Sequence, residues 1–195
     1  QQDPGHVAVI ATDDEPTRAI AATLSSPVEV HAADISATEQ LAWPALQGPH
    51  NAQNIAIALA AAEALGLDAQ RTRASLATYA SLPHRMERTA EHRGVLYVND
   101  SKATNPASTA PALGAFPRIH WIVGGLPKGD NLDECAEHFG HVVHAYTIGE
   151  AGPAFAEQLE QVMPVTRSEM LASAVRSAMD NAQAGEVVLL SPACA

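Results

Sequence analysis

The chain has 195 residues, 47% of them hydrophobic, and its 22 acidic and 11 basic residues give a formal net charge of −11. This charge argues against a general nucleic-acid binder or a surface attracted to anionic lipid, because both of those partners are themselves negatively charged. No apolar run approaches the roughly 20 residues that a membrane-spanning helix requires, so the composition is typical of a globular protein with a substantial core.

The first 80 residues predict a short strand and helix followed by Ala-rich helices. An apolar run over residues 7–11 indicates a buried strand. Acidic residues and Pro16 then mark a helix start. Further elements are predicted as a helix ending near residue 24, a strand over 28–30, and helices over 51–65 and 69–79, the last capped by Asp68.

The rest of the chain repeats a strand-then-helix pattern. Strands are predicted over residues 95–98, 119–123, 142–148 and 187–190, and helices over 106–113 (capped by Asn105), 131–139, 151–161 and 168–182 (capped by Ser168). This alternation predicts an α/β fold with a mostly parallel sheet covered by helices on both faces. The change of rhythm at residues 81–83 predicts two domains, 1–82 and 83–195.

Polar side chains follow several of these strands. In open parallel sheets, ligands bind beyond the carboxyl ends of the strands. The two lysines of the chain both stand there, Lys102 after the first strand of the repeat and Lys128 after the second. Compact ammonium groups, hydroxyls and helix-start amides suit a small dianion near a phosphate. The accompanying side chains are Asp100, Ser101, Thr104 and Ser191.

Each of these residues also has a simpler interpretation. Asp100 and Asn105 could be turn and cap residues, and Gly124 and Gly125 could serve only a tight turn.

The spacing from Gly124 to Gly129 imitates a phosphate-binding P-loop, which requires Lys and then Ser or Thr after the second glycine. Asp130 stands there instead, so no P-loop is predicted.

Two further polar groups lie upstream of the repeat. Asn51 and Asn54 are three residues apart and so share a helix face, where their carboxamides could pair with a purine edge or could simply cap the helix. Arg85 could reach a phosphate across a cleft, while Glu87 and Arg88 are typical of a surface ion pair. Cys135 and Cys194 lack zinc-type spacing and are interpreted as free thiols in a reducing cytosol.

The chain resembles the Mur ligases in five stretches whose order and spacing span nearly its whole length. They are GPHNAQN at 48–54, LPHRME at 82–87, NDSKATN at 99–105, GGLPKG at 124–129 and LLSPACA at 189–195. The third and fifth stretches are similar to the branch of the family that adds D-glutamate.

The resemblance implies the end of a central α/β ATPase domain over residues 1–82 and a Rossmann-like carboxy-terminal domain over 83–195. It implies an ATP-dependent ligase of peptidoglycan precursor synthesis that joins D-glutamate to UDP-N-acetylmuramoyl-L-alanine through an acyl phosphate. The expected protein is a cytoplasmic monomer that uses ATP and Mg²⁺ and has no nucleic-acid or membrane partner.

The resemblance also implies roles for individual residues. Lys102 would lie near the acyl phosphate and Arg85 would meet the ATP phosphates, so both are expected to be catalytic. The expected nucleotide-binding residues are Asn51 and Asn54 at the adenine, Arg85 at the phosphates and Asp100 at the ribose. Thr104 and Lys128 are expected to hold one carboxylate of D-glutamate, and Ser191 the other.

The family's P-loop, its Mg²⁺-binding Glu and His and its carbamylated Lys would come before Gln1, and an aromatic contact to D-glutamate would follow Ala195. We therefore expect the isolated chain to bind weakly and not to turn over. Two alternatives stay open at this point. One is a sibling ligase for another amino acid, of the diaminopimelate or folylpolyglutamate type, and the other is a non-catalytic Rossmann-type nucleotide-binding module.

Overall fold

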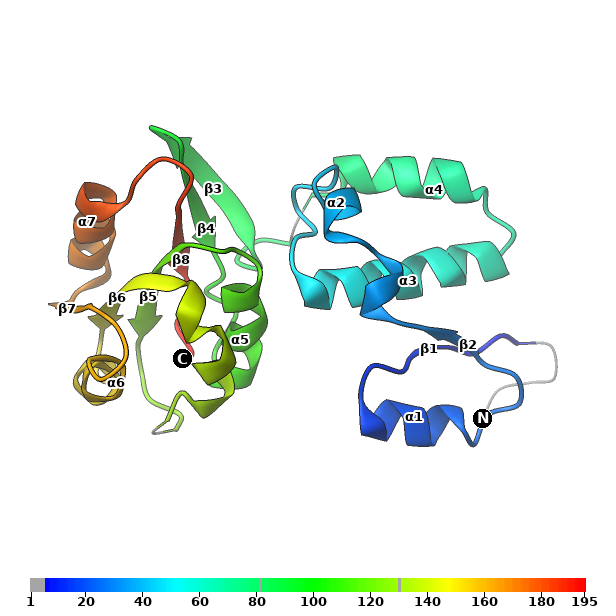
Figure 1. The fold of residues 1–195 in the computed structure, drawn as a ribbon, viewed down its shortest axis with the longest axis horizontal. Helices are drawn as coiled ribbons and strands as arrows, with labels where there is room; N and C mark the ends of the chain where they lie inside the picture. Colours follow the sequence, from blue (N-terminus) through cyan, green and yellow to red (C-terminus); the bar gives the residue numbers. More distant parts are fainter. Residues whose placement is uncertain (1–5, 81, 130) are drawn as a thin grey trace. The chain divides into compact units, whose positions relative to one another are not determined.

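A computed structural model describes residues 6–80, 82–129 and 131–195. The chain forms two compact units, Gln1–Ala80 and Ser81–Ala195, and each is described by itself (Figure 1). Ser81, at the start of the boundary that the sequence predicts, and Asp130, after the glycine-rich stretch, lie outside the described residues. Among the described residues, no helix is both long enough and apolar enough to cross a membrane.

The first unit packs one long helix against a two-stranded parallel sheet. Asp14 begins the first helix by accepting a hydrogen bond from the Thr17 amide at 2.8 Å. Trp43 and Ile55 are central to its core. The elements are β1 (Val9–Ala11), α1 (Glu15–Ala21), β2 (Val28–Val30), η1 (Ala32–Asp34), α2 (Ala37–Gln40), α3 (Pro49–Ala64), α4 (Ala69–Ser75) and η2 (Leu76–Thr78).

The second unit is built on a six-stranded sheet in the order β3-β4-β8-β5-β6-β7. Only the pairing of β3 with β4 is antiparallel. The strands are β3 (Glu87–His92), β4 (Val95–Asn99), β5 (Ile119–Gly124), β6 (Val142–Ile148), β7 (Val165–Glu169) and β8 (Val187–Leu190). The helical segments are α5 (Pro106–Gly114), η3 (Asp133–His141), α6 (Gly152–Leu159) and α7 (Leu171–Asn181).

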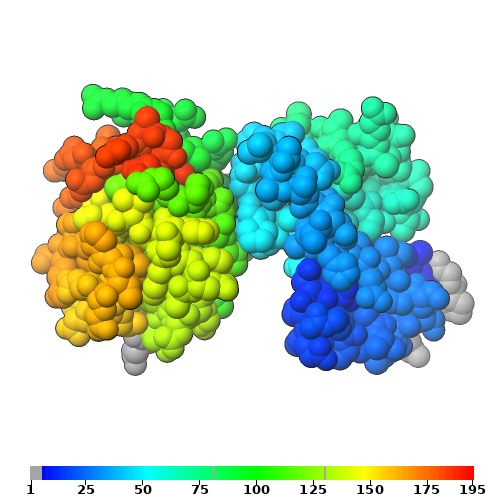
Figure 2. Space-filling model, viewed as in Figure 1, coloured from blue at the N-terminus to red at the C-terminus, as the bar shows by residue number. Residues whose placement is uncertain are grey.

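Helices cover both faces of this sheet, as the alternating pattern predicts. Trp121 packs with Leu113 of α5 and Phe155 of α6 on one face. Its neighbour Ile122 points to the other face and packs with Ala174 of α7, because successive side chains of a strand alternate. Figure 1 shows α5 and α7 on opposite sides of the sheet. Residues of η3 and α6, coloured yellow-green to orange in Figure 2, form part of this unit's visible surface.

Three details of the second unit differ from the sequence prediction. The pattern predicts a helix starting at Ser168, but residues 165–169 form β7 and α7 begins at Leu171 after Met170. The polar strand β3 is not predicted, and the segment expected as an α-helix over 131–139 is the 3₁₀ helix η3. Both missed strands lie at edges of the sheet, where one side of the backbone is unpaired and exposed side chains hide the apolar pattern.

Candidate functional site

The carboxyl ends of β4, β8 and β5 lie side by side, because these three strands are adjacent and parallel. Backbone hydrogen bonds join the loops that follow them. The Asp100 amide donates to Leu190 O at 2.7 Å, the Ala193 amide to Ala103 O at 3.0 Å, and the Gly124 amide to Pro192 O at 2.9 Å. The segment after β8 is thus held between the other two loops. This carboxyl end of the three strands, where the sequence predicts a ligand, is called the site edge.

A chain of three buried polar groups lies at this edge. Ser191 Oγ is 2.9 Å from Asp100 Oδ2 and 3.1 Å from Thr109 Oγ1, and Ser191 and Thr109 are both fully buried. A serine hydroxyl carries one proton. When Ser191 donates it to the Asp100 carboxylate, the Thr109 hydroxyl must donate to Ser191. Asp100 Oδ1 accepts from the Met86 amide at 3.1 Å.

Burial dominates the electrostatics of Asp100. Asp100 is only 7% exposed. Desolvation of the charged form therefore raises the pKa of its carboxyl above the usual 3.8. Hydrogen bonds from Ser191 and Met86 and the charge of Arg85 oppose this increase in pKa. These donors therefore favour the ionised carboxylate against the effect of burial.

The predicted cationic and hydroxyl groups stand around this buried chain. Lys102 and Lys128 are exposed, on the loops after β4 and β5, and Thr104 is half-buried just before α5. The Lys102 amide donates to His84 O at 3.0 Å, which ties this loop to the segment carrying the exposed Arg85. The structure thus brings the loops of both lysines to the site edge, with β8 between the strands that they follow.

Ser191 and Thr109 differ from what the sequence suggests. Ser191 is expected to hold a substrate carboxylate, but its hydroxyl is buried and engaged by two protein groups, so that contact stays a prediction. Thr109 was not predicted at all. A signal existed, because Thr109 lies three and four residues before the buried Ala112 and Leu113 and so shares the inner face of α5.

The glycines after β5 are required by close packing. A Cβ at Gly124 would stand 2.1 Å from Ile148 O, and one at Gly125 would stand 2.6 Å from Ala195 O. Both glycines also have positive φ, 116° and 153°, a region that other residues avoid. They do more than form a tight turn, since they let three backbone segments meet at the site edge.

The candidate adenine residues lie in the first unit, at the start of α3. The Asn51 carboxamide donates to Gln47 O at 2.8 Å, and Asn54 is exposed. His50, directly before Asn51, is half-buried, and burial lowers the pKa of its imidazole. Asn51 therefore has a local structural role whether or not it also meets a nucleotide.

Neither cysteine forms part of a reactive or metal-binding group among the described residues. Cys135 and Cys194 are free and buried, and burial with the nearby Glu134 raises the pKa of the Cys135 thiol to about 12, so it is not an activated nucleophile. Within residues 6–80, 82–129 and 131–195, no group of three His, Cys, Asp or Glu side chains could hold a metal ion.

Comparison with known proteins gives consistent similarities. The chain is 65% identical over 192 residues to the UDP-N-acetylmuramoylalanine–D-glutamate ligase of Novosphingobium aromaticivorans, covering 96% of this chain and 43% of that protein. It is 52% identical to the protein of the same name from Zymomonas mobilis, covering 100% of this chain and 44% of the relative. The chain thus spans less than half the length of these relatives.

Solved structures share the fold. The UDP-N-acetylmuramate-alanine ligase MurC of Thermotoga maritima matches with a TM-score of 0.58 at 15% identity, over 75% of this chain and 35% of that one. E. coli FolC in complex with DHPP and ADP matches with a TM-score of 0.53 at 26% identity, over 72% and 36%. Residues 84–194 match the family described as "Mur ligase, glutamate ligase domain", and the chain therefore belongs to the Mur ligase family.

Proposed function

We propose that this chain forms the carboxy-terminal portion of an ATP-dependent ligase that joins D-glutamate to UDP-N-acetylmuramoyl-L-alanine through an acyl phosphate. The observation that carries the proposal is the 65% identity, over 96% of the chain, to a relative named for this reaction. The geometry of the sheet edge supports it, because Asp100, Lys102 and Thr104 follow β4 and Lys128 follows β5, two parallel strands separated only by β8. In this proposal residues 1–82 belong to the central domain and 83–195 to the carboxy-terminal domain.

The lysines supply the local positive charge that such a reaction needs. Lys102 would neutralise charge on the transferring phosphoryl group, and Lys128 with Thr104 would hold a carboxylate of D-glutamate so that its amine faces the activated carbon. These cations stand in a chain whose formal net charge is −11. A dianionic ligand would therefore be attracted to this edge in preference to most of the surface.

Asp100, Arg85, Asn51 and Asn54 are proposed for the nucleotide. ATP supplies the phosphoryl group that activates the substrate carboxylate. Asp100 suits a ribose hydroxyl, because it is an acceptor held in place by the Met86 amide and by Ser191. Arg85 would meet the phosphates and the two asparagines the adenine. Mg²⁺ would be held by ligase residues other than those described for this chain, where no metal-binding group occurs.

We further propose that the complete ligase is a monomer of the cytoplasm, since its substrates are small soluble molecules. The chain's negative charge offers no support for a nucleic-acid or membrane partner.

A chimera tests the proposed reaction. Replacing the matching segment of the Novosphingobium protein with this chain should give an enzyme that releases phosphate only when D-glutamate, ATP and UDP-N-acetylmuramoyl-L-alanine are all present. The isolated 195-residue chain should form no product. L-Alanine and diaminopimelate serve as competing amino acids in the same assay.

A folded chimera that prefers another amino acid would support a sibling ligase in place of the proposed one. A folded chimera without any turnover would argue against the proposed catalytic roles, as would product formed by the isolated chain.

A further inference from the structure

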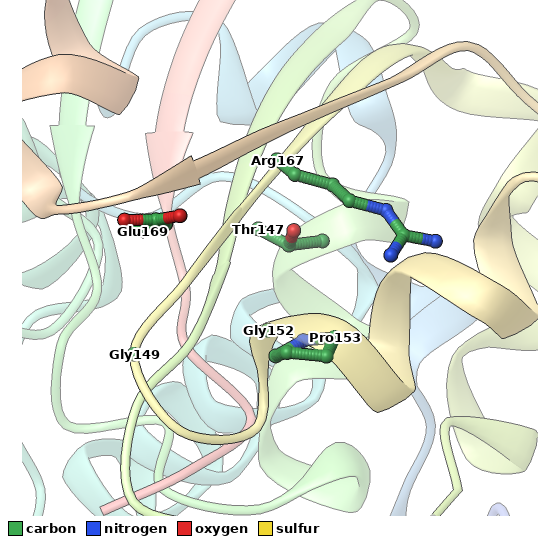
Figure 3. Close-up of a pocket in the computed structure, with 6 residues that line it drawn as sticks. All are labelled: Thr147, Gly149, Gly152, Pro153, Arg167 and Glu169. Carbon is green, nitrogen blue, oxygen red and sulfur yellow. The ribbon is translucent and has the colours of Figure 1, made fainter.

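A pocket of about 310 Å³ lies in the second unit, apart from the lysine loops. It is bordered by the carboxyl ends of β6 and β7 and by the first turn of α6 (Figure 3). This volume is at the lower end of the range of small-molecule sites. Its lining residues are Thr147, Gly149, Gly152, Pro153, Arg167 and Glu169.

The pocket contains a buried hydroxyl without a partner. Thr147 is 1% exposed, and its Oγ1 makes no hydrogen bond within the described parts of the chain. A Cβ placed on Gly152 would lie 3.7 Å from this oxygen, so a larger side chain at position 152 would extend beside the hydroxyl. A buried polar group without a hydrogen-bond partner is unfavourable, because it has lost its contacts with water. Such a cost calls for an explanation, and a ligand atom would supply one.

The strand on the other side of the pocket is distorted. The pairing of β6 with β7 shifts register between Thr147 and Ile148. Thr147 pairs with Arg167 and Ile148 with Glu169, so Ser168 has no partner residue on β6. Glu169 has φ = 61°, a conformation that is uncommon for residues other than glycine and is often found at functional sites. Residues two apart in a regular strand face the same way, but Figure 3 shows Arg167 and Glu169 extending to opposite sides of Thr147.

The two ends of the pocket therefore carry opposite charge. Arg167 gives its Nε and Nη2 groups to Glu160 at 2.8 and 2.9 Å, which leaves Nη1 for another acceptor. The start of α6 adds a partial positive charge near Gly152, and the helix cap has no side-chain hydrogen bond. Glu169 is exposed, its backbone carbonyl accepts from the Gly149 amide, and its carboxylate has no hydrogen-bond or ion-pair partner among the residues that the structure describes.

These charges select the class of ligand. Glu160 already neutralises Arg167, and Glu169 is uncompensated, so the lining as a whole is negative. A phosphate or another polyanion is therefore disfavoured. A ligand with an ammonium group would satisfy Glu169, and an acceptor at its other end would suit Arg167 Nη1 and the start of α6.

We propose that this pocket binds a small zwitterion, with its ammonium group at Glu169, its carboxylate toward Arg167 and the start of α6, and the Thr147 hydroxyl between them. The site uses none of the residues assigned to the ligase reaction. Its occupancy can therefore be tested independently of that function.

Three matched probes test this proposal on the 195-residue chain: 4-aminobutyrate, butyrate and butylamine. Amide NMR signals of residues 147–152 and 167–169 should shift saturably with 4-aminobutyrate, and the single-charge probes should bind at least about 10-fold more weakly, since each lacks one charged contact. If 4-aminobutyrate produces no saturable shift, or if either single-charge probe binds as tightly, the proposal is wrong.

Two variants connect the binding to the pocket. Gly152→Val fills the space beside Thr147, and its first atom would meet only ordinary contacts at 3.5–3.7 Å, while Glu169→Gln removes the ammonium partner without changing size. Each should weaken 4-aminobutyrate binding at least about 10-fold. Gly140→Ala, which has nothing within 4 Å of the added Cβ, should bind like the parent. Unchanged binding by Glu169→Gln would overturn the proposal even if Gly152→Val failed to fold.

Discussion

The hydroxyl of Ser191 donates a hydrogen bond to the carboxylate of Asp100 across 2.9 Å, which joins residues 91 positions apart in the sequence. It connects the end of β8 to the end of β4, in the middle of the candidate site. Because Asp100 is buried and its carboxyl has a raised pKa, this donor helps to keep the carboxylate ionised.

Ser191→Ala should lower the free energy of unfolding by about 1.5–3 kcal/mol, the usual contribution of a hydrogen bond to a charged group. Removing a donor to the ionised form should also raise the pKa of the Asp100 carboxyl further. Urea unfolding and an NMR titration of the Asp100 side chain measure the two effects. Ser173→Ala, at an exposed position of α7, is the control and should stay within about 0.5 kcal/mol of the parent. An equal pKa in Ser191→Ala and the parent would contradict this account of the bond.

Glu186 should make the chain sensitive to acid. This buried carboxylate accepts hydrogen bonds from the Gln183 amide, from Arg118 and from His120. Burial alone would raise the pKa of Glu186, but these donors outweigh burial and lower it from 4.5 to about 2. A lowered folded-state pKa stabilises the fold above pH 4.5, and this stability is lost as the pH falls toward 2. The loss should be on the order of 3 kcal/mol.

Unfolding by urea at several pH values between 5 and 2 tests this expectation. Glu186→Gln should be less stable than the parent at pH 6 and should lack the part of the acid dependence that Glu186 contributes. Glu160→Gln removes an exposed pair with Arg167 instead, and should leave stability nearly unchanged because solvent screens such a pair. If the parent and Glu186→Gln lose stability in parallel below pH 4.5, the depressed pKa is wrong.

Gly124→Ala should be strongly destabilising. The new Cβ would stand 2.1 Å from Ile148 O at a residue whose φ is 116°, so both the contact and the backbone conformation oppose it. We expect a loss of about 3 kcal/mol or more in the free energy of unfolding. Urea unfolding measures it, with Gly140→Ala as the control because that added Cβ meets nothing within 4 Å. Equal stability of the two variants would show that the close approach after β5 is not required.

The two lysines should affect different kinetic constants in the chimeric ligase. Lys102→Ala should lower kcat about 100-fold or more, because the charge it offsets develops during phosphoryl and acyl transfer. Lys128→Ala should mainly raise the KM for D-glutamate, by about 10-fold or more, because it removes a charged contact to the substrate. Steady-state phosphate release at varied D-glutamate separates the two effects. Arg176→Ala, on the exposed side of α7, should leave both constants unchanged, and a reversed pattern would exchange the proposed roles.

The buried strands could be predicted from the sequence because their signal is local. β6 and β8 match the predicted ranges, and β4 and β5 each extend one residue further, since the inner strands of a covered sheet are apolar runs bounded by turn residues. The edge strand β7, with the sequence VTRSE, carries no such run. β7 is defined by its pairing with β6, and the local sequence pattern carries no information about that separate strand.

The candidate site shows the same limit. The sequence indicates Asp100 and both lysines because they directly follow predicted strands, and the parallel sheet brings their loops to one edge. It could not reveal that Ser191 is turned inward to Asp100, since a hydroxyl at a strand end can face either way. The pocket beside Thr147 was missed because it depends on the bulge in β7 and on a glycine in α6.

The central claim is that Lys102 and Lys128 stand at one D-glutamate site, with Lys128 holding a carboxylate of the amino acid and Lys102 at the neighbouring acyl phosphate, and the presence of only two lysines in the chain makes a direct measurement possible. In the 195-residue chain labelled with [¹³Cε]lysine, NMR should show two side-chain signals, assigned by Lys102→Arg and Lys128→Arg. Titration with D-glutamate should shift both signals with one shared dissociation constant, and L-glutamate should bind more weakly. If neither signal shifts, if the two give different constants, or if both enantiomers bind equally, the two lysines do not flank one site that selects D-glutamate.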